Sequence, residues 1–300
     1  MKHIGFIGAS GLMGHGMARN LLAKGFAVSL TVHRNKDGVA DLLSAGARQV
    51  ARPADLGACD AVILCVTGTP QVEAALLGPD GVLSRARPGL VVIDTSTSEP
   101  ESTQRLGAQC ALQGVTLVDA PLARSAVEAE AGKLNTMVGA TPEVFAQIKP
   151  VLQAYCENIF HVGGPGSGHV IKLLNNFVAQ SICTATAEAF AVGAKAGVDV
   201  QQLVNVISAG AVNSGLFQAM AKTLNGDFTG LKFGLDNARK DLRYYGHLAE
   251  MVNVPSLVGQ AVHQSLATAS ALGHGNSFVP ALVTAQEQLT GAKITPAASR

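Results

Sequence analysis

The chain has 300 residues, of which 48% are hydrophobic and 14% charged, and its formal net charge is +1. So apolar a chain can bury a large core, which argues against disorder, and its length fits two domains of ordinary size. The balanced charge gives no indication of nucleic acid or of a membrane as a partner. The five cysteines form no Cys-x-x-Cys pair and no signal peptide precedes the first strand-like run, so we expect reduced thiols in a cytoplasmic protein.

Short β-branched runs alternate with amphipathic helical patterns over the first half of the chain. The expected strands lie at residues 3–8, 27–32, 61–66, 90–94, 115–119 and 134–138. The expected helices include residues 13–24, 38–44, 101–112 and 142–154. This alternation predicts an α/β fold, with an N-terminal Rossmann-type, doubly wound parallel sheet that helices cover on both faces.

Strand signals almost vanish beyond the glycine-rich loop at residues 163–168. Helical patterns follow at residues 169–196, 200–208, 236–251, 256–271 and 279–289. We therefore predict an all-α C-terminal domain, with domains at residues 1–163 and 164–295 and a tail at 296–300. The apolar run at 177–196 is interrupted by Gln180, Glu188 and Lys195, which favours a buried helix of a soluble protein over a membrane span.

A glycine-rich turn separates the first expected strand from the first helix. Its spacing is Gly-x-x-Gly-x-x-Gly, one residue longer between the first two glycines than the usual dinucleotide fingerprint. Glycines let a backbone approach a pyrophosphate, and a helix N-terminus offers N–H groups to it. The alternative is a tight turn without a ligand. The predicted cofactor-binding residues are Gly8, Ser10, Gly11, Leu12, Met13 and Gly14, with Val66 and Thr67 at the end of a later strand.

The residues after the second expected strand bear on the choice between NAD and NADP. No carboxylate stands between Thr31 and Asp37 to accept a hydrogen bond from a ribose 2′-hydroxyl. Arg34 can instead pair with a 2′-phosphate, and Lys36 can add positive charge. We therefore expect NADP to be preferred to NAD, the alternative being that Arg34 is an ordinary solvated turn residue.

A lysine opens the long helix of the second half. Asn175 and Asn176 follow Lys172 at i+3 and i+4, so the three side chains share one face of the helix. A lysine beside two amides at a domain junction suits proton transfer. An interdomain hydrogen-bond cluster without chemistry is the alternative, and this segment alone leaves both interpretations open.

Together these motifs resemble the β-hydroxyacid dehydrogenase family over nearly the whole chain. Residues 8–17 match the family's cofactor turn, apart from the inserted residue. Residues 94–100, Asp-Thr-Ser-Thr-Ser-Glu-Pro, resemble its loop beside the nicotinamide. Residues 168–176 resemble its catalytic signature, and Lys-Asp-Leu at 240–242 resembles a late helix motif.

The resemblance implies an NAD(P)-dependent oxidoreductase with named roles. Lys172 would be the general acid in carbonyl reduction and the general base in the reverse direction. Asn175 would support the substrate, with Asn176 as its neighbour. Thr97 and Lys240 would lie close to the cofactor.

One segment departs from the family pattern. Relatives usually carry Val-Ser-Gly-Gly where this chain has Leu-Ala-Arg-Ser at residues 122–125, which is similar to the sulfolactaldehyde reductase branch. An arginine offers a fork of donors suited to a carboxylate, sulfonate or phosphate. We expect Ala123, Arg124 and Ser125 to bind the anionic head of a short aldehyde or hydroxy acid. The alternative is that Arg124 points to solvent or to a partner subunit.

The remaining expectations concern metals, assembly and rival functions. The eight histidines show no metal-ligand spacing, so no metal is expected. The apolar helices suggest a homodimer or homotetramer. The rival functions are an imine reductase of similar architecture, in which the catalytic lysine is typically replaced, and a non-catalytic NADP-binding protein.

Overall fold

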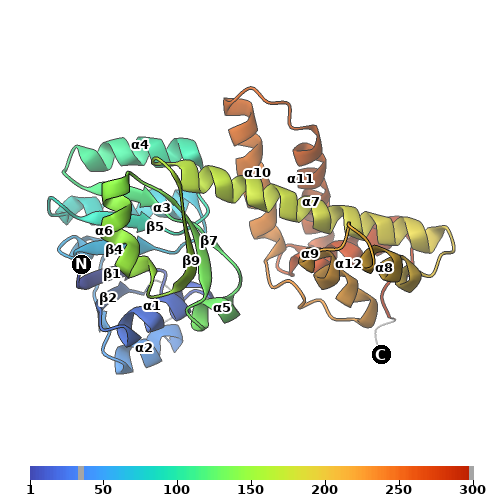
Figure 1. The fold of residues 1–300 in the computed structure, drawn as a ribbon, viewed down its shortest axis with the longest axis horizontal. Helices are drawn as coiled ribbons and strands as arrows, with labels where there is room; N and C mark the ends of the chain where they lie inside the picture. Colours follow the sequence, from blue (N-terminus) through green and yellow to red (C-terminus); the bar gives the residue numbers. More distant parts are fainter. Residues whose placement is uncertain (33–36, 297–300) are drawn as a thin grey trace. The chain divides into compact units, whose positions relative to one another are not determined.

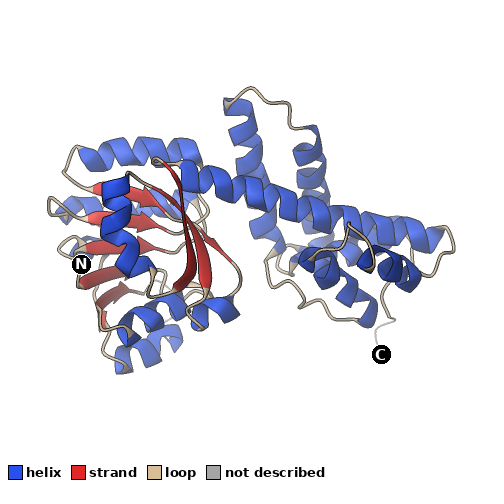
Figure 2. Ribbon diagram, in the orientation of Figure 1, coloured by secondary structure: helices blue, strands red, loops and turns tan. Residues whose placement is uncertain are grey.

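The described chain divides into two units that differ in secondary structure. The computed structural model describes residues 1–32 and 37–296, and the units are Met1–Lys172 and Leu173–Arg300. The first unit is α/β and the second is built of helices (Figure 2). The predicted fold class, a Rossmann-type sheet followed by an all-α part, is confirmed.

A nine-stranded sheet forms the centre of the first unit (Figure 1). Its strands are β1 (His3–Ile7), β2 (Ala27–Thr31), β3 (Arg48–Gln49), β4 (Ala61–Leu64), β5 (Val91–Asp94), β6 (Thr116–Asp119), β7 (Leu122–Ala123), β8 (Leu134–Gly139) and β9 (Cys156–Gly163). The order is β3-β2-β1-β4-β5-β6-β8-β7, with β9 on β8. Strands from β3 to β6 in this order pair in parallel, whereas β8 runs antiparallel to β6 and β7. The strand order reverses between β1 and β4, which makes the carboxyl ends of these strands the expected ligand crevice.

Helices cover both faces of this sheet. They are α1 (Gly14–Ala23), α2 (Ala40–Ser44), α3 (Thr69–Leu77), α4 (Pro100–Ala111), α5 (Ala126–Glu130) and α6 (Pro142–Leu152), with the 3₁₀ turns η1 (Asp37–Val39), η2 (Pro53–Leu56) and η3 (Val82–Arg85). Phe6 and Ile63 pack into a core with α1, α2 and α6. Val62 and Leu64 belong to a second core with α3 and α4. Each central strand is therefore buried on both sides, which explains its continuous apolar sequence.

The second unit is a set of helices around its own apolar core. Its elements are α7 (Ser167–Lys195, which begins in the first unit), α8 (Val200–Ser208), α9 (Gly215–Ala221), η4 (Lys222–Asn225), α10 (Leu235–Met251), α11 (Leu257–Ala269), the π-helical turn η5 (Ser270–His274), η6 (Val279–Ala281) and α12 (Leu282–Thr290). Among the described helices, α7 alone is long and apolar enough to cross a membrane by length and composition. Its residues Cys183, Ala187 and Phe190 are buried in the core of this unit. One side of α7 is therefore part of the core of this unit.

The structure contains elements that the sequence did not predict. The two-residue strand β7, the strand β9 and the helix α9 are absent from the predicted set. In β9, Cys156 is buried whereas Phe160 is 51% exposed, and its pairing with β8 shifts register twice. A strand with this irregular pairing has no clean alternation of polar and apolar residues, so its sequence carries little signal.

His15 joins three helices of the first unit. Its Nδ1 lies 2.7 Å from Glu130 Oε1 in α5, and its Nε2 lies 3.0 Å from the Asp41 carboxylate in α2. Burial lowers the pKa of His15, but hydrogen bonds and charge attraction from Asp41 and Glu130 outweigh burial and raise it above the ordinary 6.5. The ring therefore bridges two carboxylates beside the glycine turn.

Candidate active site

The glycine turn connects β1 to α1, and two of its glycines are required by the fold itself. Gly8 has a φ of 97°, and a Cβ there would lie 2.1 Å from the Cys65 carbonyl oxygen. A Cβ on Gly14 would lie 2.2 Å from the Gly8 carbonyl oxygen. Gly11 donates its N–H to that same oxygen at 3.0 Å, and a Cβ on it would come only to 3.2 Å. Local packing therefore requires glycine at positions 8 and 14, whereas a Cβ at position 11 would be crowded but not in collision.

The N-terminus of α1 fits a bound pyrophosphate. Within residues 1–32 and 37–296, no side chain accepts a hydrogen bond at its N-cap, Met13. Gly11 and Leu12 are exposed, Leu12 to 75%, and Ser10 is half-buried. A helix start without a side-chain cap thus lies beside the exposed backbone of Gly11 and Leu12, and an arrangement of this kind suits phosphate groups.

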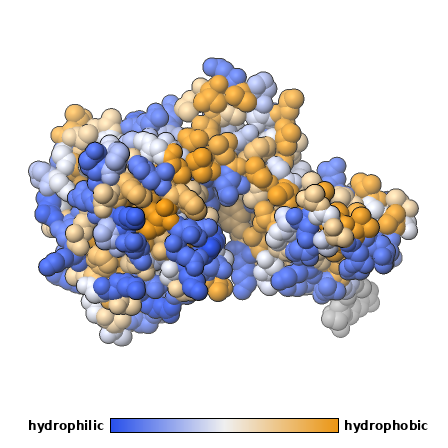
Figure 3. Space-filling view, viewed as in Figure 1, coloured by the Kyte–Doolittle hydropathy of each residue, from blue (hydrophilic) through white to orange (hydrophobic). Residues whose placement is uncertain are grey.

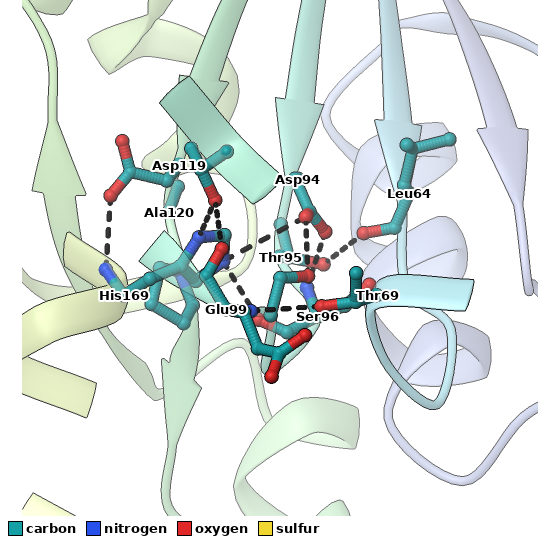
Figure 4. A network of polar contacts seen from close by, with 12 residues as sticks. Leu64, Thr69, Asp94, Thr95, Ser96, Glu99, Asp119, Ala120 and His169 are labelled. Carbon is teal, nitrogen blue, oxygen red and sulfur yellow. Dashed lines mark hydrogen bonds and ion pairs between the residues drawn. The ribbon is translucent and has the colours of Figure 1, made fainter. Parts of the chain in front are cut away.

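A network of polar contacts holds the loop after β5 (Figure 4). Asp94, 2% exposed, ends the strand, and its carboxylate accepts hydrogen bonds from Ser96 N at 2.9 Å and from Ser98 Oγ at 2.8 Å. Glu99 N donates to Thr69 Oγ1 at 2.9 Å, which joins the loop to the start of α3. The loop is therefore fixed from both ends by its own buried carboxylate and by a neighbouring helix.

The same network brings together three residues that the sequence assigned to the cofactor. Val66 N donates to Ser96 Oγ at 3.0 Å, which places the end of the β4 segment against the loop after β5. Thr67 follows Val66 in the chain, and Thr97 follows Ser96. These residues lie at the carboxyl ends of adjacent parallel strands, the edge where ligands of such sheets bind.

Asp119 caps the start of α7. This fully buried carboxylate ends β6 and accepts hydrogen bonds from Gly166 N at 2.7 Å and from His169 N at 2.9 Å. A carboxylate at a helix N-terminus satisfies its N–H groups and complements its dipole. Lys172 lies one turn beyond His169 and is half-buried. The sequence presented Asp119 only as a strand end, and no local pattern signalled that it caps a helix start 47 residues later.

The ring of His169 is wholly buried in the same network. Its Nδ1 lies 2.7 Å from Thr103 Oγ1 in α4, and its Nε2 lies 3.2 Å from the Ser96 carbonyl oxygen. Nε2 is also 3.7 Å from Asp94 Oδ2. His169 was not expected to be catalytic, and in the structure its ring connects α7 with α4 and with the loop after β5.

In the second unit, the buried carboxylate of Asp241 lies at the centre of a second group of polar residues. Asn176, 5% exposed, donates to Asp241 Oδ2 at 2.6 Å and accepts from Asn175 Nδ2 at 3.2 Å. Lys240 Nζ lies 3.1 Å from Asp241 Oδ1. Asn175 is exposed, whereas Asn176 serves as a buried link between α7 and α10. Asp241, for which the sequence predicted no role, contacts Asn176 and Lys240, and Asn175 joins them through Asn176.

Arg124 occupies an unusual backbone position. Its φ is 81°, in the left-handed region that favours glycine. Its Nη1 donates to the Lys133 carbonyl oxygen at 2.6 Å and pairs with the Glu157 carboxylate in β9. The arginine therefore has partners within its own unit, and both of them contact Nη1.

The neighbours of Arg124 have structural tasks of their own. Ser125 is the N-cap of α5, where its Oγ accepts from Val127 N at 3.2 Å. Its N–H and hydroxyl donate to the Glu128 carboxylate, and these hydrogen bonds lower the pKa of that group. Ala123 is half-buried in β7. Ser125 thus completes a capping box that fixes the segment after Arg124.

The remaining predicted site features are a 2′-phosphate contact and the absence of metal ligands. Arg34, predicted to select NADP, lies outside the described residues. In the described ranges, no group of three or more His, Cys, Asp or Glu residues is placed to hold a metal ion. Burial raises the pKa of the Cys59 and Cys110 thiols to about 11, so both stay protonated at neutral pH.

Comparison with known proteins places the chain among dehydrogenases. The family model for the NAD binding domain of 6-phosphogluconate dehydrogenase matches residues 3–163, and that for the NAD-binding of NADP-dependent 3-hydroxyisobutyrate dehydrogenase matches residues 166–285. The 2-(hydroxymethyl)glutarate dehydrogenase of Eubacterium barkeri is 33% identical over 97% of each chain. The 3-sulfolactaldehyde reductase of Escherichia coli is 32% identical over 92% of each chain. The 3-hydroxyisobutyrate dehydrogenase structure from Salmonella typhimurium has a TM-score of 0.83 at 29% identity and covers 95% of this chain and 99% of that one.

The Rossmann-type sheet and the glycine turn at its switch point define a dinucleotide-binding protein. With these relatives, the chain belongs to the β-hydroxyacid dehydrogenase family, as its motifs indicated. It acts on CH–OH groups with NAD or NADP and interconverts a hydroxy acid and its aldehyde by hydride transfer.

Proposed function

We propose that Lys172 is the general acid and base of this reaction. The observation that carries the proposal is its position one turn into a helix whose start is capped by the buried Asp119. The nicotinamide supplies the hydride in reduction and accepts it in oxidation. The Lys172 ammonium donates a proton to the carbonyl oxygen in reduction, and the neutral amine takes it from the hydroxyl in oxidation.

The glycine turn and the neighbouring strand ends would hold the cofactor. Gly8, Ser10, Gly11, Leu12, Met13 and Gly14 form the turn that leads into α1, and Gly11 and Leu12 are its exposed residues. Val66, Thr67 and Thr97 border the next two strands, and Lys240 comes from the second unit. The preference for NADP rests on Arg34 and on the missing carboxylate before Asp37.

The substrate in this proposal is a short anionic aldehyde or its hydroxy acid. Arg124 would hold the anionic head, beside Ala123 and Ser125. The support is chemical, because a guanidinium binds carboxylates and sulfonates with paired hydrogen bonds. The names of the two relatives, one a glutarate derivative and one a sulfonated aldehyde, fit an anionic substrate. Asn175 would orient the reacting oxygen, while the buried Asn176 anchors the helix to Asp241.

The test is a rate screen that follows NADPH or NADH absorbance with a panel of short aldehydes. The panel holds succinic, tartronate and methylmalonate semialdehydes, sulfolactaldehyde and glyoxylate. We expect turnover of an anionic aldehyde with NADPH and a loss of at least about 100-fold in Lys172→Met, which keeps the side-chain length without the proton. Unchanged NADPH binding by that variant is the control. Tight NADPH binding without turnover of any aldehyde would favour an imine reductase or a non-catalytic NADP-binding protein.

The same proposal includes assembly as a homodimer or homotetramer in the cytoplasm. Exposed apolar side chains gather at the turn between α10 and α11 (Figure 3). Met251, Val252, Val254, Leu257 and Val258 are each at least 45% exposed there. An apolar group of this kind is typical of a surface that meets a partner. Light scattering after size-exclusion chromatography would give the subunit number, and a monomer would contradict this part of the proposal.

A further inference from the structure

We propose that His169 is a positioning residue, which ties the loop at residues 94–100 to the first turn of α7 and thereby fixes Lys172 relative to that loop. This inference rests on the proposed function, since it assumes that Lys172 and Thr97 work at the same reacting centre. All of the contacts that carry it lie within the first unit (Figure 4).

The partners of the ring determine where its proton lies. Nε2 faces two acceptors, the Ser96 carbonyl oxygen at 3.2 Å and Asp94 Oδ2 at 3.7 Å. Neither can donate, so Nε2 must carry a hydrogen. Nδ1 faces the Thr103 hydroxyl, which can donate to it or accept from it. The essential contact is therefore the hydrogen bond from Nε2–H to the Ser96 carbonyl, because Ser96 belongs to the loop.

His169 makes two contacts with segments that follow different strands, one through its backbone and one through its ring. Its backbone N–H donates to Asp119 at the end of β6, and its ring reaches the loop after β5. The ring has 0% exposure, so water cannot replace a lost partner. Lys172 is three residues further along the same helix, and its stem therefore moves with the anchored turn. Displacing a catalytic group by about 1 Å can cost roughly 100-fold in rate.

The rival interpretation is that His169 only fills space in the core. Substituting His169 by side chains of similar size distinguishes the positioning role from the space-filling role. His169→Gln can place an amide N–H near the position of Nε2, His169→Asn places one near Nδ1, and His169→Leu fills the volume without a donor. A space-filling role predicts that leucine substitutes at least as well as glutamine.

Four measurements on each variant test the inference. They are kcat, KM for the aldehyde, the Kd of NADPH from fluorescence, and hydrogen exchange of the amides at residues 96–99. We expect His169→Gln to keep kcat within about threefold, and His169→Leu and His169→Asn to lower it by about 10- to 100-fold with KM changed less than about threefold. Exchange at residues 96–99 should rise in the leucine and asparagine variants alone.

The exchange measurement needs no substrate, so it separates this inference from the proposed function. Equal exchange and equal kcat in all three variants would overturn the positioning role, as would rates that simply follow the unfolding midpoints. Loop exchange that rises in the leucine and asparagine variants would support the tie even if the wild-type enzyme turned over none of the aldehydes. The proposed function would then fail on its own.

Discussion

Replacing Glu157 by glutamine shows whether Arg124 has to leave an internal partner before it can hold a substrate anion. The two side chains are 47% and 32% exposed, so solvent screens their attraction. Pairs of this kind contribute about 0.2–1 kcal/mol. Because 1.4 kcal/mol corresponds to a factor of ten in affinity, releasing Arg124 should lower KM for an anionic aldehyde by about 1.4- to 5-fold. We expect kcat to stay unchanged, since Glu157 has no part in the proton or hydride transfer.

Initial rates over a range of aldehyde concentrations, followed by NADPH absorbance, give KM and kcat. Glu73→Gln is the matched control, because it removes the same charge from another ion pair, with Arg105, on the α3–α4 side. Arg124→Ala tests the same idea in the opposite direction, because removing the guanidinium should raise KM for the anionic aldehyde strongly. A rise in KM for Glu157→Gln, or no change in KM for Arg124→Ala, would refute the competition and with it the anion-binding role of Arg124.

Three further predictions concern the backbone and pH. Arg124 has a φ of 81°, so Arg124→Gly should be more stable than Arg124→Ala by about 0.5–1 kcal/mol. The reason is that the left-handed conformation costs alanine more free energy than glycine loses in backbone entropy on folding. Urea unfolding measures the difference, and a more stable alanine variant would contradict the prediction. Gly11→Ala should fold normally but weaken NADPH binding. Gly14→Ala should lower the unfolding midpoint, because its Cβ would lie 2.2 Å from a carbonyl oxygen. Unchanged NADPH affinity in Gly11→Ala would count against a cofactor role for the turn. His15 has a folded pKa raised above its unfolded value near 6.5, so its stabilising contribution is complete below that pH and is lost as the pH rises through the folded pKa. The stability gap between wild type and His15→Gln, within about 1 kcal/mol, should therefore be wider at pH 6 than at pH 8, and a gap that widens toward pH 8 would be inconsistent with the bridge.

The parts of the fold that the sequence predicts well are those with a local signal. The central strands carry unbroken apolar runs because both of their faces are buried, and the glycine spacing marks the turn before α1. The second half has the period of helices and few β-branched runs. These patterns depend on neighbours within a few residues, so a single sequence reveals them.

The missing parts depend on contacts between distant residues. Asp119 caps a helix start 47 residues later, and Asp241 accepts from Asn176 across 65 residues. The residues next to each carboxylate form no sequence pattern that would indicate its hydrogen-bond partner. Arg124 was identified by its chemistry, but its pairing with Glu157 depends on the strand β9. Because polar and apolar residues do not alternate regularly in β9, the sequence did not predict this strand. Buried polar partners therefore remain beyond what periodicity can predict.

The capping of α7 limits how freely evolution or an engineer could exchange the two halves of this chain. A crossover placed in the glycine loop at residues 163–166 would keep the whole helix with the donor of the C-terminal half. The groups that hold its first turn, Asp119, Ser96 and Thr103, would come from the other parent. A chimera of two relatives would therefore keep the first turn of α7 and Lys172 in place only when residue 169 matches the side chains at 103 and 119, because Ser96 contributes only its backbone carbonyl. The practical unit of inheritance is this set of residues, which lies within the first unit and extends past the boundary predicted at residue 163.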